Sequence, residues 1–371
     1  MKIIKKKINS IQDVTFYIST NQNKKININL NKYDRAIIFC DQNIKNIYAD
    51  FEKKIKKKIS ILKPIFLKAN EQTKSLSNLP YILSCLEKYK CSRNDLIIAI
   101  GGGSITDIIS FTSSIYMRGI DLFLVPTTLM GQADATTAGK TCINSLYTKN
   151  IIGTYFLPKY VYSNTGYLKN LPTYELRQGM SEIFKYGLLG SKKLIKLLEK
   201  FLIDKKNEST IAKILVETIK VRIALRKRNG LISNLGHTFG HAFEKTSNHN
   251  VAHGDAISVG IVLALKFALE ERIITSNFYE KIKTLMQKLE LNTKIDKNYN
   301  IDQIINVMMK DKKSRHNLIG LVLIKDISKI LTSTKKPFYY VDQKKMKIFL
   351  KNNLQLFSTK NHWKRLKKNY V

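Results

Sequence analysis

The stretch Asp95-Leu96-Ile97-Ile98-Ala99-Ile100-Gly101-Gly102-Gly103-Ser104-Ile105-Thr106-Asp107 decides the fold. Its first part is a continuous apolar run, which is typical of a parallel strand buried on both faces. Three consecutive glycines then lead into an apolar stretch that we expect to be helical. Glycines at such a turn let backbone amides approach a pyrophosphate at the positive end of the helix. The stretch therefore predicts a Rossmann-like dinucleotide site, although it lacks the usual GxGxxG spacing.

Other apolar runs extend the expected sheet. Residues 35–40 end at Asp41-Gln42-Asn43, residues 65–67 precede Asn70-Glu71-Gln72-Thr73-Lys74, and residues 121–125 end at Pro126-Thr127-Thr128. Polar residues in these places are expected where a nucleotide lies beyond the carboxyl ends of parallel strands, and ordinary polar turns are the alternative. A helical pattern over residues 76–88 alternates with these runs, which favours an α/β domain with a parallel sheet.

The composition changes after this region. Residues 131–153 are rich in Gly, Thr and Ala, which is typical of a site loop or a mobile linker. Asp134, Lys140, Lys149 and Asn150 in this segment are suited to hold an acidic, hydroxylated substrate. Beyond the prolines at 158 and 172 the pattern is almost wholly helical. We therefore expect a Rossmann-like domain over residues 1–165 and an all-helical, metal-binding domain over residues 166–371.

Histidine is concentrated in one part of the second domain. Four of the six histidines lie between His237 and His253. In a helix, His237 and His241 would be an i,i+4 pair, roughly 6 Å apart at Cβ, a spacing that suits two imidazole ligands of one metal ion. His253 and a carboxylate from elsewhere would complete such a site, and the alternative is an ordinary polar helix face. Gly236 and Gly240 each cost a helix about 1 kcal/mol, which suggests that something approaches this backbone closely.

A second helical stretch offers the carboxylate. Its residues are Arg177-Gln178-Gly179-Met180-Ser181-Glu182-Ile183-Phe184-Lys185-Tyr186-Gly187. Glu182 lies among apolar neighbours, which is unusual for an acid unless it is paired or binds a metal ion. A surface salt bridge to Lys185 at i,i+3 is the alternative.

The net charge of +36 raises the possibility of a polyanionic partner. However, the chain has 54 lysines against 10 arginines, and the lysines are spread over every segment without a nucleic-acid-binding motif. We therefore expect no dedicated nucleic-acid partner. The absence of an eighteen-residue apolar run and of an apolar leader predicts a cytoplasmic protein with no membrane partner. The four cysteines form no CxxC pair and are expected to be reduced thiols.

Taken together, these motifs resemble 3-dehydroquinate synthase, a family of sugar phosphate cyclases. The resemblance runs from about residue 34 to residue 327. The motifs that carry it are Gly101-Gly102-Gly103-Ser104-Ile105-Thr106-Asp107, Tyr116-Met117-Arg118-Gly119-Ile120, Val125-Pro126-Thr127-Thr128-Leu129, Ala138-Gly139-Lys140-Thr141, Lys149-Asn150-Ile151-Ile152-Gly153, Glu182-Ile183-Phe184-Lys185-Tyr186-Gly187, Asn234-Leu235-Gly236-His237-Thr238-Phe239-Gly240-His241-Ala242, His253-Gly254-Asp255-Ala256 and Asp311-Lys312-Lys313.

The resemblance implies a carbon-oxygen lyase of the shikimate pathway of aromatic amino acid biosynthesis. A member of this family is usually a homodimer that binds NAD and one zinc ion, or cobalt in its place. It converts 3-deoxy-D-arabino-heptulosonate 7-phosphate to 3-dehydroquinate and phosphate by transient oxidation, phosphate elimination, reduction and aldol cyclisation. Two alternatives remain open: an NAD- and metal-dependent polyol or alcohol dehydrogenase of the related superfamily, and a non-catalytic relic of the fold.

The resemblance also implies site residues. The metal ligands are Glu182, His237 and His253. The substrate contacts are Arg118, Asp134, Lys140, Asn150, Lys185, Asn234 and His241. The NAD contacts are Asp41, Asn43, Glu71, Lys74, Gly103, Ser104, Ile105, Thr106, Asp107, Thr127, Thr128, Lys140 and Lys149, with Tyr167, Leu168, Lys169 and Asn170 beside them.

The chain departs from the family pattern before the histidine motif. The segment that ends at Asn234 is several residues shorter than the family's, and its substrate-binding arginine has no clear counterpart. Arg226 or Arg228 is a candidate replacement, and Lys220 matches a substrate-contacting lysine. In addition, Asn70 stands where the family usually has glycine, and Ala138-Gly139 replaces a double glycine.

Overall fold

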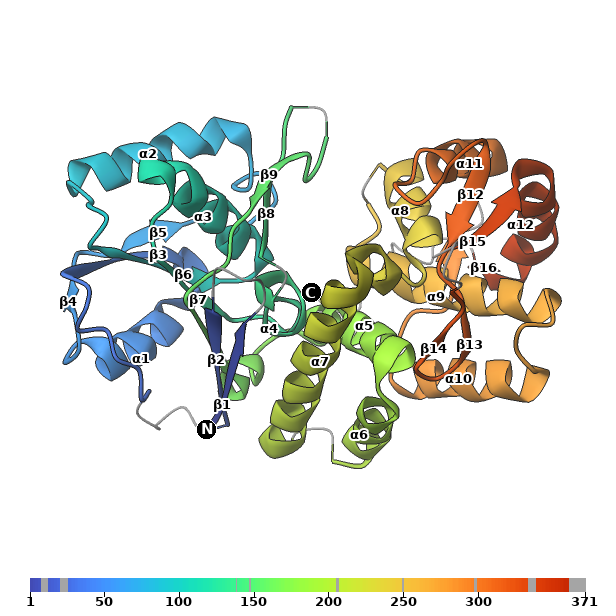
Figure 1. The fold of residues 1–371 in the computed structure, drawn as a ribbon, viewed down its shortest axis with the longest axis horizontal. Helices are drawn as coiled ribbons and strands as arrows, with labels where there is room; N and C mark the ends of the chain where they lie inside the picture. Colours follow the sequence, from blue (N-terminus) through green and yellow to red (C-terminus); the bar gives the residue numbers. More distant parts are fainter. Residues whose placement is uncertain are drawn as a thin grey trace. The chain divides into compact units, whose positions relative to one another are not determined.

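The computed structural model describes residues 1–7, 13–20, 26–137, 139–146, 148–204, 207–248, 250–296, 299–332 and 338–359, so that Ala138 lies outside the described residues. The chain divides into two compact units, Met1–Leu171 and Pro172–Val371 (Figure 1). The boundary expected near residue 165 falls in a short 3-10 segment, Thr165–Leu168, which belongs to the first unit.

The first unit contains an eight-stranded sheet. Its strands are β1 (Lys2–Lys7), β2 (Asp13–Ser19), β3 (Arg35–Asp41), β4 (Ser60–Ile61), β5 (Ile65–Leu67), β6 (Leu96–Gly101), β7 (Leu122–Pro126) and β10 (Tyr160–Asn164). Their order is β1-β2-β10-β7-β6-β3-β4, and β5 also pairs with β3. All pairings are parallel except that of β1 with β2. The predicted parallel sheet is therefore confirmed, while β1, β2, β4 and β10 lie outside the apolar runs described above.

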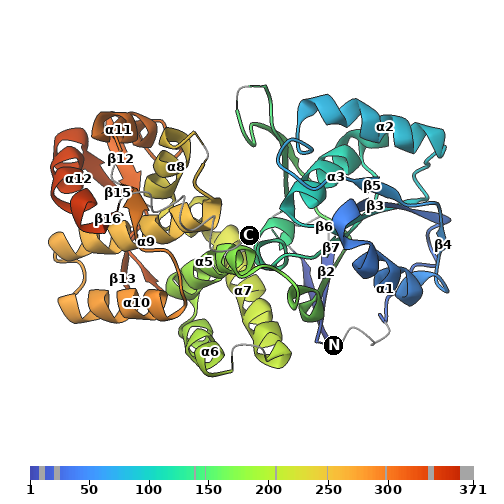
Figure 2. The same ribbon diagram turned by 180° about the vertical axis from the view of Figure 1, so that it is seen from behind.

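Helices cover both faces of this sheet. Helix α1 (Lys45–Ile55) lies on one face, and α2 (Leu79–Lys88) and α3 (Gly103–Ile115) lie on the other (Figures 1 and 2). On the α1 face the Phe51 and Phe123 rings pack edge to face, with centroids 5.5 Å apart. Strand β6 is buried throughout. Because both faces are covered, the carboxyl ends of the strands are the natural place for a ligand.

The segment expected to be a loop or linker is largely ordered structure. It contains α4 (Leu129–Ala133) and a hairpin of β8 (Lys140–Ile143) and β9 (Ile152–Tyr155). The Thr141 hydroxyl lies 2.8 Å from that of Thr154, so that the threonines join the two strands. The expectation of a loop was wrong because short β-branched runs on either side of a turn are difficult to separate from the surrounding Gly, Thr and Ala.

The second unit is mainly helical, as predicted. Its helices are α5 (Thr173–Gly190), α6 (Lys192–Ile203), α7 (Glu208–Asn229), α8 (His237–Thr246), α9 (His253–Glu270), α10 (Ser276–Lys288), α11 (Ile301–Met309) and α12 (Gln343–Phe357). It is not all-helical, because three two-stranded sheets accompany the helices: β12 (Leu318–Leu321) with β15 (Tyr339–Asp342), β13 (Ile324–Asp326) with β14 (Lys329–Ile330), and β11 (Ile295–Asp296) with β16 (Ser358–Thr359). Over the described residues, no helix is both long and apolar enough to cross a membrane.

Helices α8 and α9 cross at very close range. Gly236 has a φ of +77°, and a Cβ added there would lie 2.6 Å from the backbone nitrogen of Ile261. A Cβ added at Gly260 would lie 2.1 Å from the carbonyl oxygen of Gly236. The close approach expected at the glycines of the histidine motif is therefore that of α9. Because both helices begin with histidine, this crossing brings His237 and His253 together.

Candidate metal and cofactor sites

Three residues of the second unit form a cluster that can hold a metal ion. Glu182 comes from the middle of α5, and His237 and His253 are the first residues of α8 and α9. Oε1 of Glu182 lies 3.7 Å from Nε2 of His237 and 3.6 Å from Nε2 of His253. One ligand atom from each residue lies within 4.8 Å of the other two. Ligand atoms placed about 2.1 Å from a tetrahedral zinc ion would be about 3.4 Å apart, close to these separations.

The state of Glu182 supports a metal ion at this place. Its side chain is 1 % exposed, and among the described residues Oε1 accepts no hydrogen bond. A buried carboxylate oxygen without a hydrogen bond is costly unless a cation satisfies it. Two imidazoles and one carboxylate are also a common donor set of catalytic zinc sites, which leave one position open. The residues present therefore fit a divalent metal ion.

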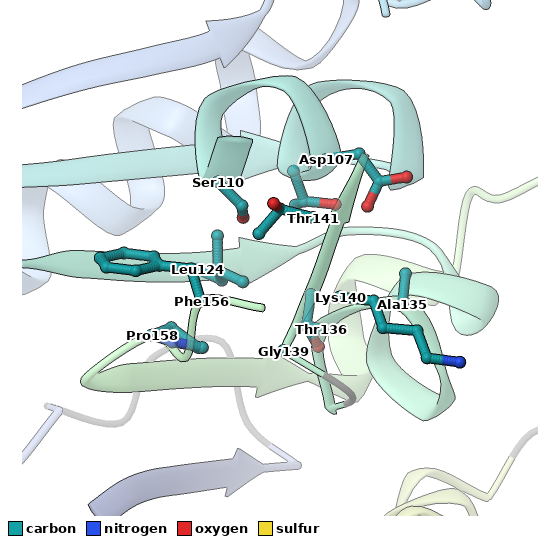
Figure 3. A pocket seen from close by; sticks show the side chains of 11 residues that line it. Asp107, Ser110, Leu124, Ala135, Thr136, Gly139, Lys140, Thr141, Phe156 and Pro158 are labelled. Carbon is teal, nitrogen blue, oxygen red and sulfur yellow. The ribbon is translucent and has the colours of Figure 1, made fainter. Parts of the chain in front are cut away.

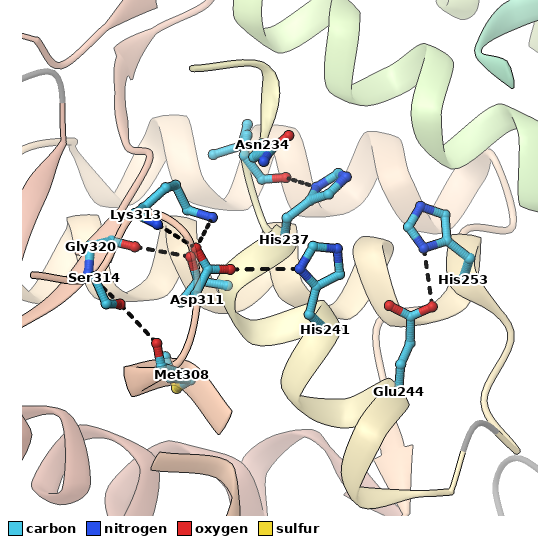
Figure 4. A network of polar contacts seen from close by, with 12 residues as sticks. Asn234, His237, His241, Glu244, His253, Met308, Asp311, Lys313, Ser314 and Gly320 are labelled. Carbon is cyan, nitrogen blue, oxygen red and sulfur yellow. Dashed lines mark hydrogen bonds and ion pairs between the residues drawn. The ribbon is translucent and has the colours of Figure 1, made fainter. Parts of the chain in front are cut away.

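Hydrogen bonds orient both imidazoles for this role. Nδ1 of His237 lies 3.1 Å from the Leu235 carbonyl oxygen, and Nδ1 of His253 lies 3.1 Å from Oε1 of Glu244 (Figure 4). When Nδ1 donates to an oxygen, Nε2 carries the lone pair. Both rings therefore offer Nε2 toward Glu182. Glu244 was missed in the sequence, although its position three residues after His241 places it on the same face of α8.

The pKa values favour an ionised Glu182 and a cation at His253, and they favour a neutral imidazole at His237. Burial raises the pKa of Glu182, but Lys185 and the two histidines outweigh it and hold that pKa well below its usual range. Burial and the Lys185 ammonium lower the pKa of His237. Burial opposes a proton on His253 as well, but Glu244 and Glu182 raise its pKa to about 10. A divalent cation that binds Nε2 takes the place of this proton.

Lys185 is the partner of the other Glu182 oxygen. Its ammonium donates to Oε2, and the side chain is 2 % exposed. The i,i+3 salt bridge considered as an alternative to metal binding thus exists, but it is buried and leaves Oε1 available. The Lys185 ammonium also lies 4.4 Å from the ring centroid of Tyr186.

His241 lies beside the cluster without belonging to the group of three ligands. Its ring centroid is 5.2 Å from that of His237, and its Nδ1 is 3.6 Å from Oδ2 of Asp311 (Figure 4). Asp311 also accepts hydrogen bonds from the backbone nitrogen and the ammonium of Lys313. The pair suggested by the i,i+4 spacing is therefore not the ligand pair in the structure. Asn234 lies just before α8, where its carbonyl oxygen accepts from the His237 backbone amide.

In the first unit, the predicted cofactor contacts gather at the carboxyl edge of the sheet. Gly101, Asp41 and Pro126 end the adjacent strands β6, β3 and β7. The Thr127 backbone amide donates to the Gly101 carbonyl oxygen over 3.0 Å, and a Cβ added at Gly102 would lie 3.0 Å from Cγ2 of Thr128. The glycine turn and the two threonines therefore lie side by side. The Asp41 side chain accepts from the Asn43 amide at the start of a 3-10 turn.

A partly buried polar network continues this edge. The Lys74 ammonium forms an ion pair with Asp107 in α3. Burial lowers the pKa of Lys74, but the Asp107 carboxylate outweighs burial, so the pKa is raised. Asn144 follows β8, and its amide nitrogen donates to Oε1 of Glu71 over 2.8 Å. The Asn144 side-chain oxygen accepts from the Asn150 backbone amide over 2.9 Å. Asn144, which the sequence analysis missed, therefore joins two groups of predicted ligand contacts.

A pocket lies between α3 and the hairpin (Figure 3). It has about 230 Å³ of space, including the part open to solvent, and three predicted contacts line it: Thr106, Asp107 and Lys140. Leu124 and Phe156 add apolar walls. In Figure 3 the Lys140 side chain extends away from Leu124.

Other predicted contacts take different places. Arg118 follows α3, and the 13 residues of this helix separate it by about 20 Å from the glycine turn. The Tyr167 ring is in the core, and its hydroxyl donates to Asp50. The first turn of α3 contains Gly103, Ser104 and Ile105. Leu168 is buried in the 3-10 segment that follows β10. Lys149, Lys169 and Asn170 are exposed, and Asp134 is partly buried at the end of α4.

The shortened segment continues α7 directly into a 3-10 turn, Gly230–Ser233. The candidate arginines are both in the last turn of α7, where Arg226 is partly buried and Arg228 is exposed. Lys220 is exposed on the same helix. The segment before Asn234 is therefore helical as far as this 3-10 turn.

Comparison with solved structures defines the fold. A 2-deoxy-scyllo-inosose synthase complexed with carbaglucose-6-phosphate, NAD+ and Co2+ has a TM-score of 0.85 at 21% identity, covering 95% of this chain and 100% of its own. A 2-epi-5-epi-valiolone synthase from Streptomyces hygroscopicus with NAD+ and Zn2+ bound has a TM-score of 0.79 at 21% identity, covering 93% and 98%. An iron-containing alcohol dehydrogenase has a TM-score of 0.65 at 16% identity, covering 93% and 98%. The fold is thus that of the sugar phosphate cyclases.

Sequence comparison specifies the family within this class. Residues 64–178 match the family model of the 3-dehydroquinate synthase N-terminal part, and residues 179–314 match that of the C-terminal part. The 3-dehydroquinate synthase of Pelagibacter ubique is 34% identical and covers 95% of this chain and 100% of its own length. That of Clostridium tetani is 32% identical and covers 84% and 86%. The chain belongs to the 3-dehydroquinate synthase family.

Proposed function

We propose that this chain is a 3-dehydroquinate synthase, a lyase that converts 3-deoxy-D-arabino-heptulosonate 7-phosphate to 3-dehydroquinate and phosphate in the shikimate pathway. The observation that carries the proposal is the buried cluster of Glu182, His237 and His253, found in a chain whose two halves both match this family. Two of the solved structures with this fold contain NAD together with cobalt or zinc. The donor set fits the same kind of ion here.

When bound, NAD would reversibly oxidise a carbon of the substrate that bears a hydroxyl group, and zinc or cobalt would polarise the oxygen of that hydroxyl. Glu182, His237 and His253 hold the metal ion, and the hydrogen bonds to Leu235 and Glu244 keep both imidazoles aligned. The glycine turn and Thr127–Thr128 receive the cofactor at the positive end of α3, because the first amides of a helix lack carbonyl partners. The Lys74 ammonium and the Asp107 carboxylate add paired charges beside this place.

The chain's cations hold the substrate phosphate and carboxylate by charge-assisted hydrogen bonds, which are stronger than hydrogen bonds between neutral groups. In this proposal Lys140, Lys185 and Arg118 share that role, with neutral or acidic contacts from Asn150, Asn234, His241 and Asp134. Lys185 is also the internal counterion of Glu182, so it keeps the carboxylate ionised for metal binding. A simple alcohol dehydrogenase would not need such a set of cations.

We further propose that the enzyme is a homodimer in which Arg118 serves the partner protomer. Arg118 follows the end of α3 that is opposite to the glycine turn, about 20 Å along the helix from the proposed cofactor place. The cytoplasm is the proposed location, and the four free cysteines fit a reducing compartment.

The test of function is phosphate release from the heptulosonate phosphate, followed together with NADH absorbance. A 3-dehydroquinate synthase releases phosphate without net NADH, because the hydride returns to the substrate. NADH that accumulates with simple polyols, without phosphate release, would instead identify a dehydrogenase. Binding of NAD and zinc without any turnover would identify a non-catalytic relic.

The test of the dimer is a mixing experiment with two variants, Arg118→Ala and His253→Ala. If Arg118 acts on the partner, random pairing leaves one intact site in half of the dimers, and the mixture recovers up to about a quarter of wild-type activity. If Arg118 acts within its own chain, no mixed dimer has an intact site. Activity that stays at the level of the separate variants would therefore rule out the proposed role.

A further inference from the structure

Two buried side chains join the helices that carry the metal ligands. The Gln178 amide nitrogen donates to Oδ2 of Asp255 over 2.9 Å, and the Gln178 amide oxygen accepts from the Asp255 backbone nitrogen over 3.1 Å. Arg177 adds an ion pair, with Nε 3.3 Å from Oδ1 of Asp255. All three residues are nearly inaccessible, at 7 %, 6 % and 2 % exposure for Arg177, Gln178 and Asp255. The amide of Gln178 thus uses both of its ends on one residue of the other helix.

The backbones of α5 and α9 leave no room for a side chain at Gly254. A Cβ added at Gly254 would lie 2.5 Å from the Gln178 carbonyl oxygen and 2.6 Å from its Cα. Asp255 also lies in the first turn of α9, where a carboxylate is favoured by the helix dipole. The start of α9 is therefore held against α5 by backbone contact, two hydrogen bonds and an ion pair.

The joined residues are immediate neighbours of two metal ligands. Gln178 precedes Glu182 by one helical turn in α5, and Asp255 follows His253 by two residues in α9. A displacement of α9 along α5 would therefore change the separation between Oε1 of Glu182 and Nε2 of His253, which is 3.6 Å. None of the three joining residues has an atom in the ligand cluster itself.

We propose that Gln178 and Asp255, supported by Arg177, are positioning residues of the metal site, because their contact fixes the distance between Glu182 and His253. This inference rests on the metal ion of the proposed function. Metal sites tolerate only small errors in ligand position, of about 0.5 Å. A buried ion pair adds little net stability compared with apolar residues of similar size, so a structural role alone explains this arrangement poorly. What it does provide is one fixed register between α5 and α9.

The experiment compares Gln178→Met and Asp255→Asn with the wild-type chain. Gln178→Met keeps the length of the side chain and removes both hydrogen bonds, while Asp255→Asn removes the charge. The dissociation constant for zinc is measured by competition with a chelator. Replacing residues that support metal ligands typically weakens metal binding by about 10- to 100-fold. We expect the zinc dissociation constants of both variants to rise by a factor in this range.

A matched control is present in the other unit. Asp95 is 0 % exposed, pairs with Arg35 at 2.7 Å and accepts from the Ser92 backbone amide, so its environment resembles that of Asp255. Asp95→Asn should lower the melting temperature and leave the zinc dissociation constant unchanged. The visible spectrum of the cobalt-loaded proteins gives a second measure, since it changes with ligand geometry and not with global stability. We expect an altered spectrum for Gln178→Met and a wild-type spectrum for Asp95→Asn.

Wild-type zinc affinity and cobalt spectra in both variants would overturn the positioning role. So would an equal loss of zinc affinity in Asp95→Asn, because the effect would then follow stability. If the wild-type chain itself binds no zinc, the metal assignment fails and the positioning role fails with it. Should Gln178→Met not fold, Gln178→Asn carries the same test, because it keeps the amide and withdraws it by one methylene.

Discussion

Nδ1 of His253 lies 3.1 Å from Oε1 of Glu244, while Nε2 of the same ring lies 3.6 Å from Oε1 of Glu182. The imidazole is thus held between two carboxylates. The carboxylate at Nδ1 fixes the ring and increases the basicity of Nε2, which strengthens a metal bond formed there.

We therefore expect Glu244→Ala to weaken zinc binding by about 10- to 100-fold, measured by chelator competition. Glu244→Gln should lose less, since its amide oxygen can still accept from Nδ1 although the charge is gone. Glu280→Gln is the control, because this exposed residue of α10 pairs with Lys283 of its own helix at 3.7 Å. Equal zinc affinity in Glu244→Ala and the wild type would show that Glu244 does not support His253.

Asn144 gives a corresponding prediction for the cofactor. Its side chain holds both Glu71 and the Asn150 backbone, so Asn144→Ala should release two groups of predicted contacts at once. We expect the dissociation constant for NAD, measured by fluorescence titration, to rise by about 10-fold, which corresponds to the loss of one or two net hydrogen bonds. Zinc affinity should stay the same.

Asn353→Ala is a matched control for this experiment. Asn353 is 1 % exposed, and its amide donates to Oε1 of Glu270 and to the Phe349 carbonyl oxygen, but it lies in the second unit. It should cost stability without changing NAD affinity. If both asparagine variants weaken NAD binding equally, the Asn144 effect comes from stability.

The glycine crossing predicts a large effect on stability. A Cβ at Gly260 would lie 2.1 Å from the Gly236 carbonyl oxygen, and backbone cannot move aside as a flexible side chain can. Gly260→Ala should therefore lower the free energy of unfolding by at least about 1 to 3 kcal/mol, the usual cost of overpacking a core. Gly230→Ala is the control, because a Cβ there meets nothing within 4 Å and its φ is −57°. Thermal unfolding that is unchanged in Gly260→Ala would contradict the crossing geometry.

The sequence was sufficient to predict the elements whose pattern is local. The run that ends in Gly101-Gly102-Gly103 gave β6 and α3, since a continuous apolar strand followed by glycines has few other solutions. Strand β10 was not predicted, because Tyr160-Val161-Tyr162-Ser163-Asn164 is short and partly polar. Its burial comes from pairing with β2 and β7, which are far away in the chain.

The same distinction applies to the metal cluster. Helical spacing alone favoured His237 with His241, because these residues share one face of α8. The structure instead groups His237 with His253 and Glu182, which come from two other helices, and gives His241 to Asp311. Only the close crossing at Gly236 and Gly260 produces that grouping, and such a tertiary contact has no periodic signature. The resemblance to a family supplied this information, because it had already selected the three residues together.

The shortened segment before Asn234 leads to the last prediction. If nothing replaces the family's arginine, loss of a charge-assisted contact to the substrate carboxylate should cost roughly 2 to 3 kcal/mol of transition-state binding, leaving a slow enzyme. If Arg226 or Arg228 replaces it, changing the correct residue to alanine should lower kcat/KM by about 10- to 100-fold while NAD binding stays intact. Arg226 is the better candidate, because it is partly buried whereas Arg228 is exposed. The measurement is phosphate release by the wild type and by both alanine variants, and equal rates in all three would exclude both arginines.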